Sequence, residues 1–143
     1  MKAGVKQLVL DASIAVAWCF DDEITPLTER ILDLLSSGGE AFTPALWPLE
    51  VANALLVAER RKRISAARVT ALLRRIGALP ISVEAIESNR AFDQILSLAR
   101  QQQLTEYDAA YLELALRRNL PLATLDDKLL QTARDMGIPL LTA

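Results

Sequence analysis

Short apolar runs alternate along the chain with longer segments in which apolar residues recur every three or four positions. Short runs bounded by turn residues are typical of buried strands, and the longer periodic segments are typical of amphipathic helices. The runs predict strands over residues 7–10, 41–43, 79–83, 121–125 and 138–141. The periodic segments predict helices over residues 12–20, 26–37, 46–63, 65–77, 84–103, 105–118 and 126–136.

This alternation of strands and helices is typical of α/β proteins. We expect a three-layer sandwich in which helices flank a mostly parallel central sheet. The chain has 143 residues, and its 5 glycines and 6 prolines are scattered singly, so we expect a single domain over residues 1–143. Ligands of such sheets bind beyond the carboxyl ends of the strands.

Two acids stand at predicted strand ends. Asp11 follows the first strand and Asp126 follows the fourth, and each also begins a helix. Aspartate is a favourable helix N-cap, so capping explains either residue when it is taken alone. Two caps at adjacent strand ends would place like charges close together, and a cation between them would relieve the repulsion.

Two further acids stand on apolar helix faces. Glu50 shares its side of the helix over residues 46–63 with apolar residues, and the basic residues of that helix begin only at Arg60. A buried carboxylate needs a partner, which is either a metal ion or an ion pair, and we favour the metal ion. Asp108 lies on the apolar side of its helix, although a capping box with Thr105 also explains it.

The residue types limit the chemistry. The chain has no histidine and one cysteine, Cys19, so neither a conventional zinc site nor an intramolecular disulfide is expected. A site made only of carboxylates favours a hard divalent cation, Mg²⁺ or Mn²⁺. Such cations suit the hydrolysis of phosphate esters.

Charge is distributed unevenly. The net charge is -2, yet residues 60–75 hold seven basic residues and no acid, which leaves -9 on the rest of the chain. This segment, with Arg60, Arg61, Lys62 and Arg63 at its start, is either a surface for an RNA backbone or a pair of solvated helix faces. The apolar N-terminal run is too short to span a bilayer, so we expect a cytoplasmic protein without a membrane segment.

Four segments, taken in order, resemble the PIN-domain family, and more narrowly the VapC-type ribonuclease toxins of bacterial toxin–antitoxin pairs. They are DAS (11–13), LWPLEVANAL (46–55), LTEYDAAYLELA (104–115) and LPLATLD (120–126). The resemblance covers essentially the whole chain. It implies a metal-dependent endoribonuclease with an RNA substrate, a small antitoxin partner and a homodimer.

The resemblance also assigns residues. It implies that one or two divalent ions are held by Asp11, Glu50, Asp108 and Asp126, and that Asp127 can exchange roles with Asp126. Polar neighbours expected to orient these ligands are Ser13, Asn53 and Thr124. With no histidine in the chain, the general base would be a carboxylate or a metal-bound hydroxide.

Two other classes of function remain open. A non-catalytic module that binds RNA or protein would keep the fold without the chemistry. A receiver-type phosphoacceptor domain also places acids at strand ends. It would, however, need an acidic pair after the first strand and an acceptor aspartate after the third, whereas this chain has Asp11 alone and places Glu50 within a helix.

Overall fold

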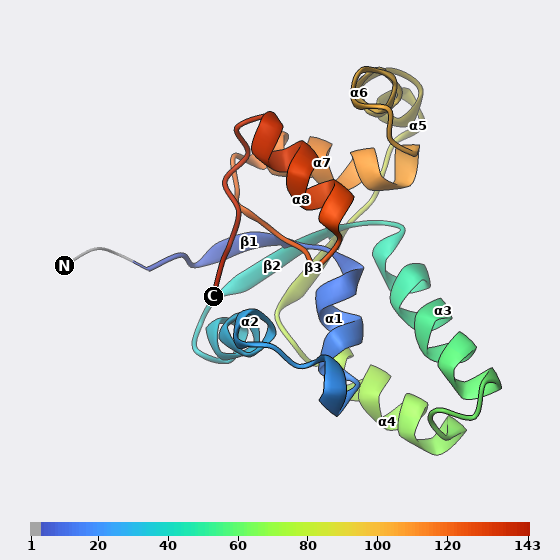
Figure 1. Ribbon diagram of the computed structural model, residues 1–143. Helices are drawn as coiled ribbons and strands as arrows, with labels where there is room; N and C mark the ends of the chain where they lie inside the picture. The colour runs from blue at the N-terminus through green and yellow to red at the C-terminus, as the bar shows by residue number, and fades with distance from the viewer. Residues whose placement is uncertain (1–3) are drawn as a thin grey trace.

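A parallel sheet lies at the centre of the protein, and helices cover both of its faces (Figure 1). The computed structural model describes residues 4–143, in which the sheet has four strands in the order β3-β2-β1-β4. Every pairing in this sheet is parallel. The α/β prediction is thereby confirmed. The strands are β1 (Gln7–Leu10), β2 (Glu40–Pro44), β3 (Ile81–Glu84) and β4 (Leu122–Ala123).

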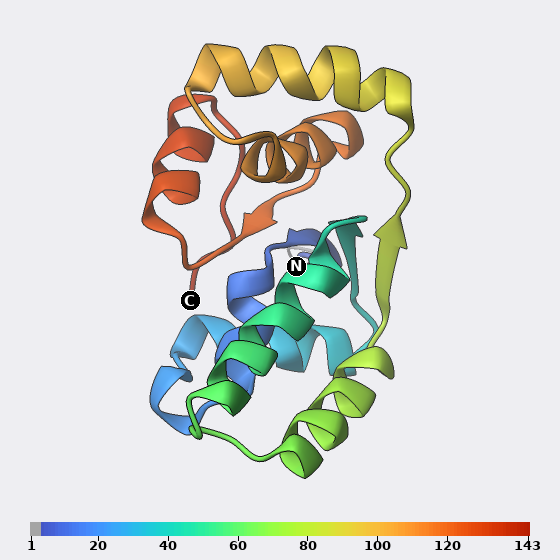
Figure 2. The same cartoon turned by 90° about the vertical axis from the view of Figure 1, so that its right-hand side faces the viewer.

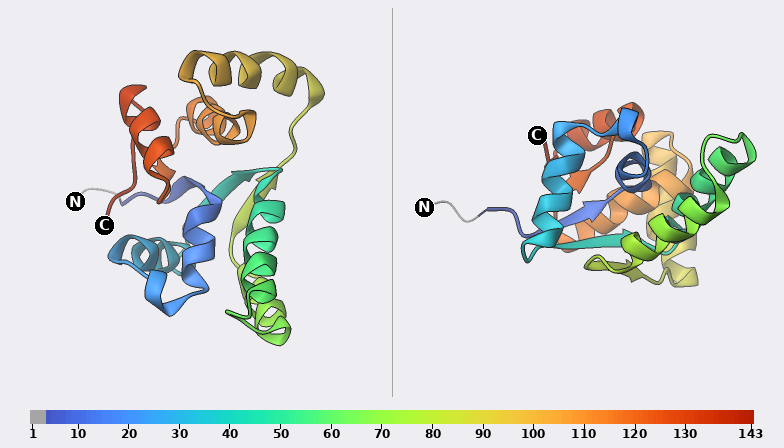
Figure 3. Two further views of the ribbon diagram at one scale, coloured as in Figure 1. Left: turned by 45° about the vertical axis from the view of Figure 1, so that its right-hand side comes forward. Right: turned by 90° about the horizontal axis from the view of Figure 1, so that it is seen from below.

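The helices form two layers. On one side of the sheet lie α1 (Ala12–Trp18), α2 (Pro26–Ser36), α3 (Trp47–Arg60) and α4 (Ala66–Gly77), with a short 3₁₀ turn, η1 (Asp21–Glu23), between α1 and α2. The other side is covered by α7 (Glu106–Arg118), α8 (Asp127–Asp135) and a continuous rod of α5 (Ser88–Arg90), η2 (Ala91–Ile95) and α6 (Leu96–Gln102) (Figure 2). Helices α3 and α4 meet at an angle and project at one corner (Figure 3).

The core is built around the central strand. Leu8, Val9 and Leu10 of β1 are completely buried, as expected for a strand that is covered on both faces. The chain runs from β1 outward to β2 and β3, and then returns to the other side of β1 to form β4. The direction of strand addition therefore reverses between β1 and β4, which is where open α/β sheets bind their ligands.

The carboxyl-terminal strand expected over residues 138–141 is wrong, because this segment forms only an isolated bridge between Leu122 and Leu140. Pro139 has no N–H group, so it cannot extend a ladder of hydrogen bonds. The helix expected over residues 84–103 begins later, at Ser88. Glu84 pairs within β3 instead, and the rod contains a π-helical segment.

Helix α3 is also shorter than expected, since it ends at Arg60. Lys62 has a φ of 59°, a left-handed conformation that breaks the helix. Most other helix boundaries agree with the sequence pattern, including the caps that Ser65 and Thr105 provide for α4 and α7. No helix within residues 4–143 is long and apolar enough to cross a membrane.

Candidate functional site

Asp11 follows β1 directly and is only 7% exposed. It occupies the N-cap position of α1, yet its side chain makes no capping hydrogen bond to any residue that the structure describes. Instead, Asp11 Oδ2 accepts hydrogen bonds of 2.6 Å from Ser13 Oγ and from Thr124 Oγ1. Helix capping therefore does not explain Asp11.

Ser13 and Thr124, which we call the hydroxyl brace, connect the ends of β1 and β4. Thr124 Oγ1 accepts a hydrogen bond of 3.0 Å from the backbone N–H of Asp126, and Ser13 Oγ accepts one of 2.9 Å from the backbone N–H of Leu125. The brace thus fixes the Asp11 carboxylate relative to the segment that carries Asp126. Sequence reasoning expected both brace residues to lie near the acids.

Asp126 is exposed and caps α8. Its Oδ1 accepts a hydrogen bond of 2.9 Å from the backbone N–H of Leu129, so the capping explanation describes one of its two oxygens. The other oxygen, Oδ2, forms no hydrogen bond within the described residues. Capping therefore leaves Oδ2 able to bind a cation. Asp127 is the first residue of α8 and is also exposed.

Glu50 lies in the first turn of α3 and is half-buried. Its Oε1 accepts a hydrogen bond of 2.5 Å from the hydroxyl of Tyr111, which is completely buried on α7. Tyr111 was not among the site residues expected from the sequence. Asn53, expected near the acids, is exposed and forms no hydrogen bond in the part of the chain that the structure covers.

Asp108 lies in the first turn of α7 and is half-buried. Its backbone N–H donates a hydrogen bond of 3.2 Å to the hydroxyl of the N-cap residue Thr105. Thr105 therefore caps α7 through a hydrogen bond from the backbone N–H of Asp108, and this bond does not involve the Asp108 carboxylate. The electrostatic surroundings of the Asp108 carboxylate connect it to the other acids.

Glu50 and Asp108 lie close enough to the other acids for the charges of those acids to affect their ionisation. The pKa of Glu50 is raised, mainly because the side chain is partly buried. The hydrogen bond from Tyr111 lowers this pKa, whereas the negative charges of Asp11 and Asp108 raise it. Burial also raises the pKa of Asp108, and the charges of Asp126 and Asp11 act in the same direction. All four acids therefore belong to one electrostatic neighbourhood at the carboxyl ends of β1 and β4.

One positive charge near these acids is that of Lys128, which lowers the pKa of Asp108. None of the four acids takes part in an ion pair within 4.0 Å among residues 4–143. In the same part of the chain, no three acidic side chains lie close enough together to hold a metal ion as they stand. Carboxylate oxygens that repel one another across a partly buried site nevertheless fit a hard divalent cation such as Mg²⁺ or Mn²⁺.

The basic residues at and just after the end of α3 differ in their surroundings. Arg63 Nη2 lies 3.0 Å from Asp22 Oδ1 and 3.1 Å from Glu23 Oε2, and its guanidinium stacks 3.9 Å from the ring centroid of Phe20. The guanidinium of Arg63 is thus already bound to other residues of the protein, although the side chain lies at the surface. By contrast, Arg60, Arg61 and Lys62 form no ion pair within the described residues.

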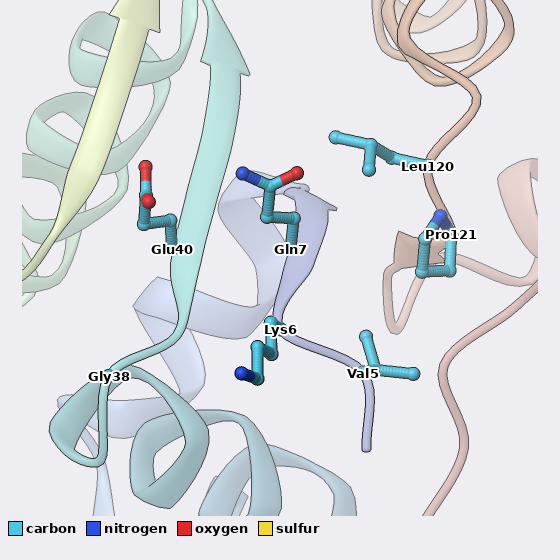
Figure 4. Close-up of a pocket in the computed structure, with 7 residues that line it drawn as sticks. All are labelled: Val5, Lys6, Gln7, Gly38, Glu40, Leu120 and Pro121. Atoms are coloured by element: carbon cyan, nitrogen blue, oxygen red, sulfur yellow. The ribbon is translucent and has the colours of Figure 1, made fainter. Parts of the chain in front are cut away.

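A hollow lies at the opposite end of the sheet from the four acids (Figure 4). It has a volume of about 520 Å³ and contains none of the four acids. Its lining combines apolar residues with one acid and one base: Val5, Lys6, Gln7, Gly38, Glu40, Leu120 and Pro121. The acids therefore mark the carboxyl edge of the sheet as the candidate site.

Comparisons with known proteins find a matching family model and several similar solved structures. The family model described as "PIN domain" matches residues 8–135. Among solved structures, PAE2754 from Pyrobaculum aerophilum is 24% identical with a TM-score of 0.69, over 90% of this chain and 79% of that one. FitAcB from Neisseria gonorrhoeae is 14% identical with a TM-score of 0.63, over 94% and 96%. A toxin–antitoxin complex from Klebsiella pneumoniae is 16% identical with a TM-score of 0.55, over 83% and 86%.

These structural likenesses show a shared fold. A comparison with curated proteins gave no significant match.

Proposed function

The chain belongs to the PIN-domain family, and from this premise we propose that it is a divalent-metal-dependent endoribonuclease that acts as the toxin of a toxin–antitoxin pair. The observation that carries the proposal is the gathering of four acids where β1 meets β4, with a raised pKa at two of them and no ion pair to any of them within the described residues. Such a site repels RNA phosphates until a cation binds, and then attracts them.

In this proposal Asp11, Glu50, Asp108 and Asp126 hold Mg²⁺ or Mn²⁺ through their carboxylate oxygens. The bound cation supplies an activated water and neutralises charge on the leaving 3′-oxygen. The hydroxyl brace orients Asp11 by donating two hydrogen bonds to its Oδ2, which leaves Oδ1 available as a ligand. A carboxylate of this set that does not bind the cation directly can accept the proton of the attacking water.

The direct test is cleavage of a single-stranded RNA by the purified protein, freed of any copurifying partner. We expect cleavage with Mn²⁺ or Mg²⁺, no cleavage with EDTA, and loss of cleavage in Asp11→Asn, which keeps the size of the side chain but removes its charge. If the metal-loaded protein cuts no RNA, the alternative of a non-catalytic PIN-like binding module replaces this proposal.

The receiver-type alternative has less support. The third strand in the chain, β3, ends at Glu84, where a receiver domain would need an acceptor aspartate. The Glu84 carboxylate is held by Arg117, at 2.8 Å, and by Arg118. Stable labelling of the protein by a small phosphodonor would be required to revive this alternative.

For the RNA we propose a path along α3. Glu50 and Arg60 lie ten positions apart on this helix, which corresponds to about 15 Å along its axis. Arg60, Arg61 and Lys62 can therefore contact backbone phosphates a few nucleotides from the acids. Arg63, the fourth basic residue expected to bind RNA, would first have to release Asp22 and Glu23.

We also propose a small antitoxin as partner, since one of the similar structures is a toxin–antitoxin complex. A site with several carboxylates and no ion pair within the described residues suits a basic segment of such a partner. Occupation of the acid site by that segment would exclude both the cation and the RNA.

For the proposed homodimer we assign an apolar face beside the acid site. Leu49 is 76% exposed and Tyr107 68%, which is high for large apolar side chains. The same face contains an apolar cleft of about 330 Å³, lined in part by Leu49, Tyr107 and Ile95. A two-fold interface pairs one patch with itself, and this face offers both projecting side chains and a hollow to receive them.

A further inference from the structure

Tyr111 is the largest completely buried side chain in the described part of the chain, and it carries a polar group into the core. Its hydroxyl donates a hydrogen bond of 2.5 Å to Glu50 Oε1. A phenylalanine would fill nearly the same volume without a polar atom that must be satisfied. The contribution that distinguishes tyrosine from phenylalanine at this position is therefore the contact with Glu50.

The Tyr111 hydroxyl also lies close to the start of α1. Burial and the hydrogen bond to Glu50 raise the pKa of the phenol, and the backbone of Ala12, the residue after Asp11, lowers it. The phenol thus lies between the start of α1 and the first turn of α3, two helices that pack against each other. A buried hydroxyl that donates to a carboxylate restrains the group to which it donates.

We infer that Tyr111 is a positioning residue that orients Glu50 toward the divalent cation; this role rests on the proposed function. Glutamate has three rotatable side-chain bonds, so a free Glu50 would lose conformational entropy when it bound a cation. The hydrogen bond at Oε1 restricts that freedom beforehand and leaves Oε2 available as a ligand. Partners of this kind typically change metal affinity by about 10–100-fold.

The test uses the two tyrosines of the chain, which both lie on α7 and are four positions apart. Tyr111→Phe removes the buried hydroxyl, and Tyr107→Phe, the matched control, removes an exposed one. Mn²⁺ binding is measured from the electron paramagnetic resonance signal of the free ion. We expect about 10-fold weaker binding in Tyr111→Phe and unchanged binding in Tyr107→Phe.

Glu50→Gln separates positioning from a general effect on the fold. If Tyr111 acts through Glu50, the double variant with Tyr111→Phe binds Mn²⁺ as weakly as Glu50→Gln alone. A further 10-fold loss in the double variant would overturn the inference. So would a Tyr111→Phe protein that binds Mn²⁺ as tightly as the wild type.

A spectroscopic measurement covers the case in which Tyr111→Phe does not fold. In Tyr107→Phe, Tyr111 is the one tyrosine left, and we expect Mn²⁺ to change its near-ultraviolet absorption, because the cation withdraws charge from the Glu50 carboxylate. A tyrosine band that Mn²⁺ leaves unchanged would contradict the role of Tyr111. Wild-type protein that binds no Mn²⁺ would overturn the proposed function and this role together.

Discussion

Thr124 donates a hydrogen bond of 2.6 Å to Asp11, although 113 positions separate the two residues in the chain. The contact exists because β1 and β4 are neighbours in the sheet and both end at the same edge. Thr124 is 1% exposed, so its hydroxyl has no access to water as an alternative partner. The position of the Asp11 carboxylate therefore depends on a residue near the other end of the sequence.

Thr124→Val should disable the site with little change in packing. Valine matches threonine in shape, but it leaves Asp11 Oδ2 with one hydroxyl donor and the backbone N–H of Asp126 without its acceptor. We expect about 10–100-fold weaker Mn²⁺ binding and RNA cleavage. The free energy of unfolding should fall by about 1–3 kcal/mol. Isothermal titration calorimetry and chemical denaturation measure the two effects.

Thr132→Val is the matched control for this change. Thr132 is also buried, but its hydroxyl donates only to the backbone carbonyl of Lys128 within α8. We expect this variant to bind Mn²⁺ and to cleave RNA as the wild type does. Equal losses in both variants would mean that any buried threonine is needed, and that the brace has no particular role.

Glu50→Gln should stabilise the metal-free protein at neutral and alkaline pH. Burial and the charges of Asp11 and Asp108 raise the pKa of Glu50 above its ordinary value of 4.5. The folded state then binds more protons than the unfolded state, so the free energy of unfolding falls as the pH rises from about 4.5 through the raised pKa. Removing the charge should increase Tm at pH 8 by about 2–5 °C in EDTA.

Glu84→Gln should have the opposite effect and serves as the control. Burial alone would raise the pKa of Glu84, but hydrogen bonds and charges from Arg117 and Arg118 outweigh burial and lower that pKa. The stability that this carboxylate contributes is present above its unfolded pKa and is lost as the pH falls through the folded pKa. We expect Glu84→Gln to reduce Tm at pH 8, where Glu50→Gln increases it. Differential scanning calorimetry over a pH series distinguishes these outcomes.

Arg61→Glu should reduce RNA cleavage. It should also make RNA affinity less sensitive to salt concentration. If Arg61 contacts an RNA phosphate, charge reversal removes one contact and reduces the slope of log affinity against log salt concentration by about 1. Lys6→Glu, at the opposite end of the sheet, makes the same change in net charge away from the acids. Cleavage that responds equally to both variants would indicate a nonspecific charge effect and no RNA path along α3.

Leu49→Glu should convert the proposed homodimer into a monomer, because Leu49 is exposed and lines the apolar cleft. A carboxylate in an apolar two-fold interface would lose its water in both copies at once. Leu116→Glu is the matched control, since Leu116 is 50% exposed on α7 but does not line the apolar cleft. Light scattering coupled to size-exclusion chromatography gives the molecular mass. A wild-type protein with the mass of one chain would refute the assignment of this face.

The sequence was most informative where a single residue interrupts a local pattern. Asp11 and Asp126 could be placed at strand ends because an apolar run followed by a helix start is visible without any tertiary information. Glu50 and Asp108 could be recognised because periodicity alone puts them on apolar faces. The structure connects these four acids electrostatically, while their role as metal ligands stays a prediction.

Features that depend on distant partners were not predictable in this way. The contact between Tyr111 and Glu50 spans 61 positions, and nothing in the local pattern distinguishes a tyrosine that donates to an acid from one that only fills the core. Similarly, Arg63 looked like part of one basic patch until its contacts with η1 were known. The strand expected over residues 138–141 failed because Pro139 interrupts a pattern that composition alone made plausible.

The strand order also determines when the site is completed during protein synthesis. A ribosome makes β1, Glu50 and Asp108 before it makes β4, yet Thr124 and Asp126 reach Asp11 only once β4 has paired with β1. A nascent chain that ends before Leu122 therefore lacks Thr124 of the brace and also the fourth acid, Asp126. For the nuclease that we propose, the translating ribosome and its message would be exposed to activity only after β4 has been made and has paired with β1.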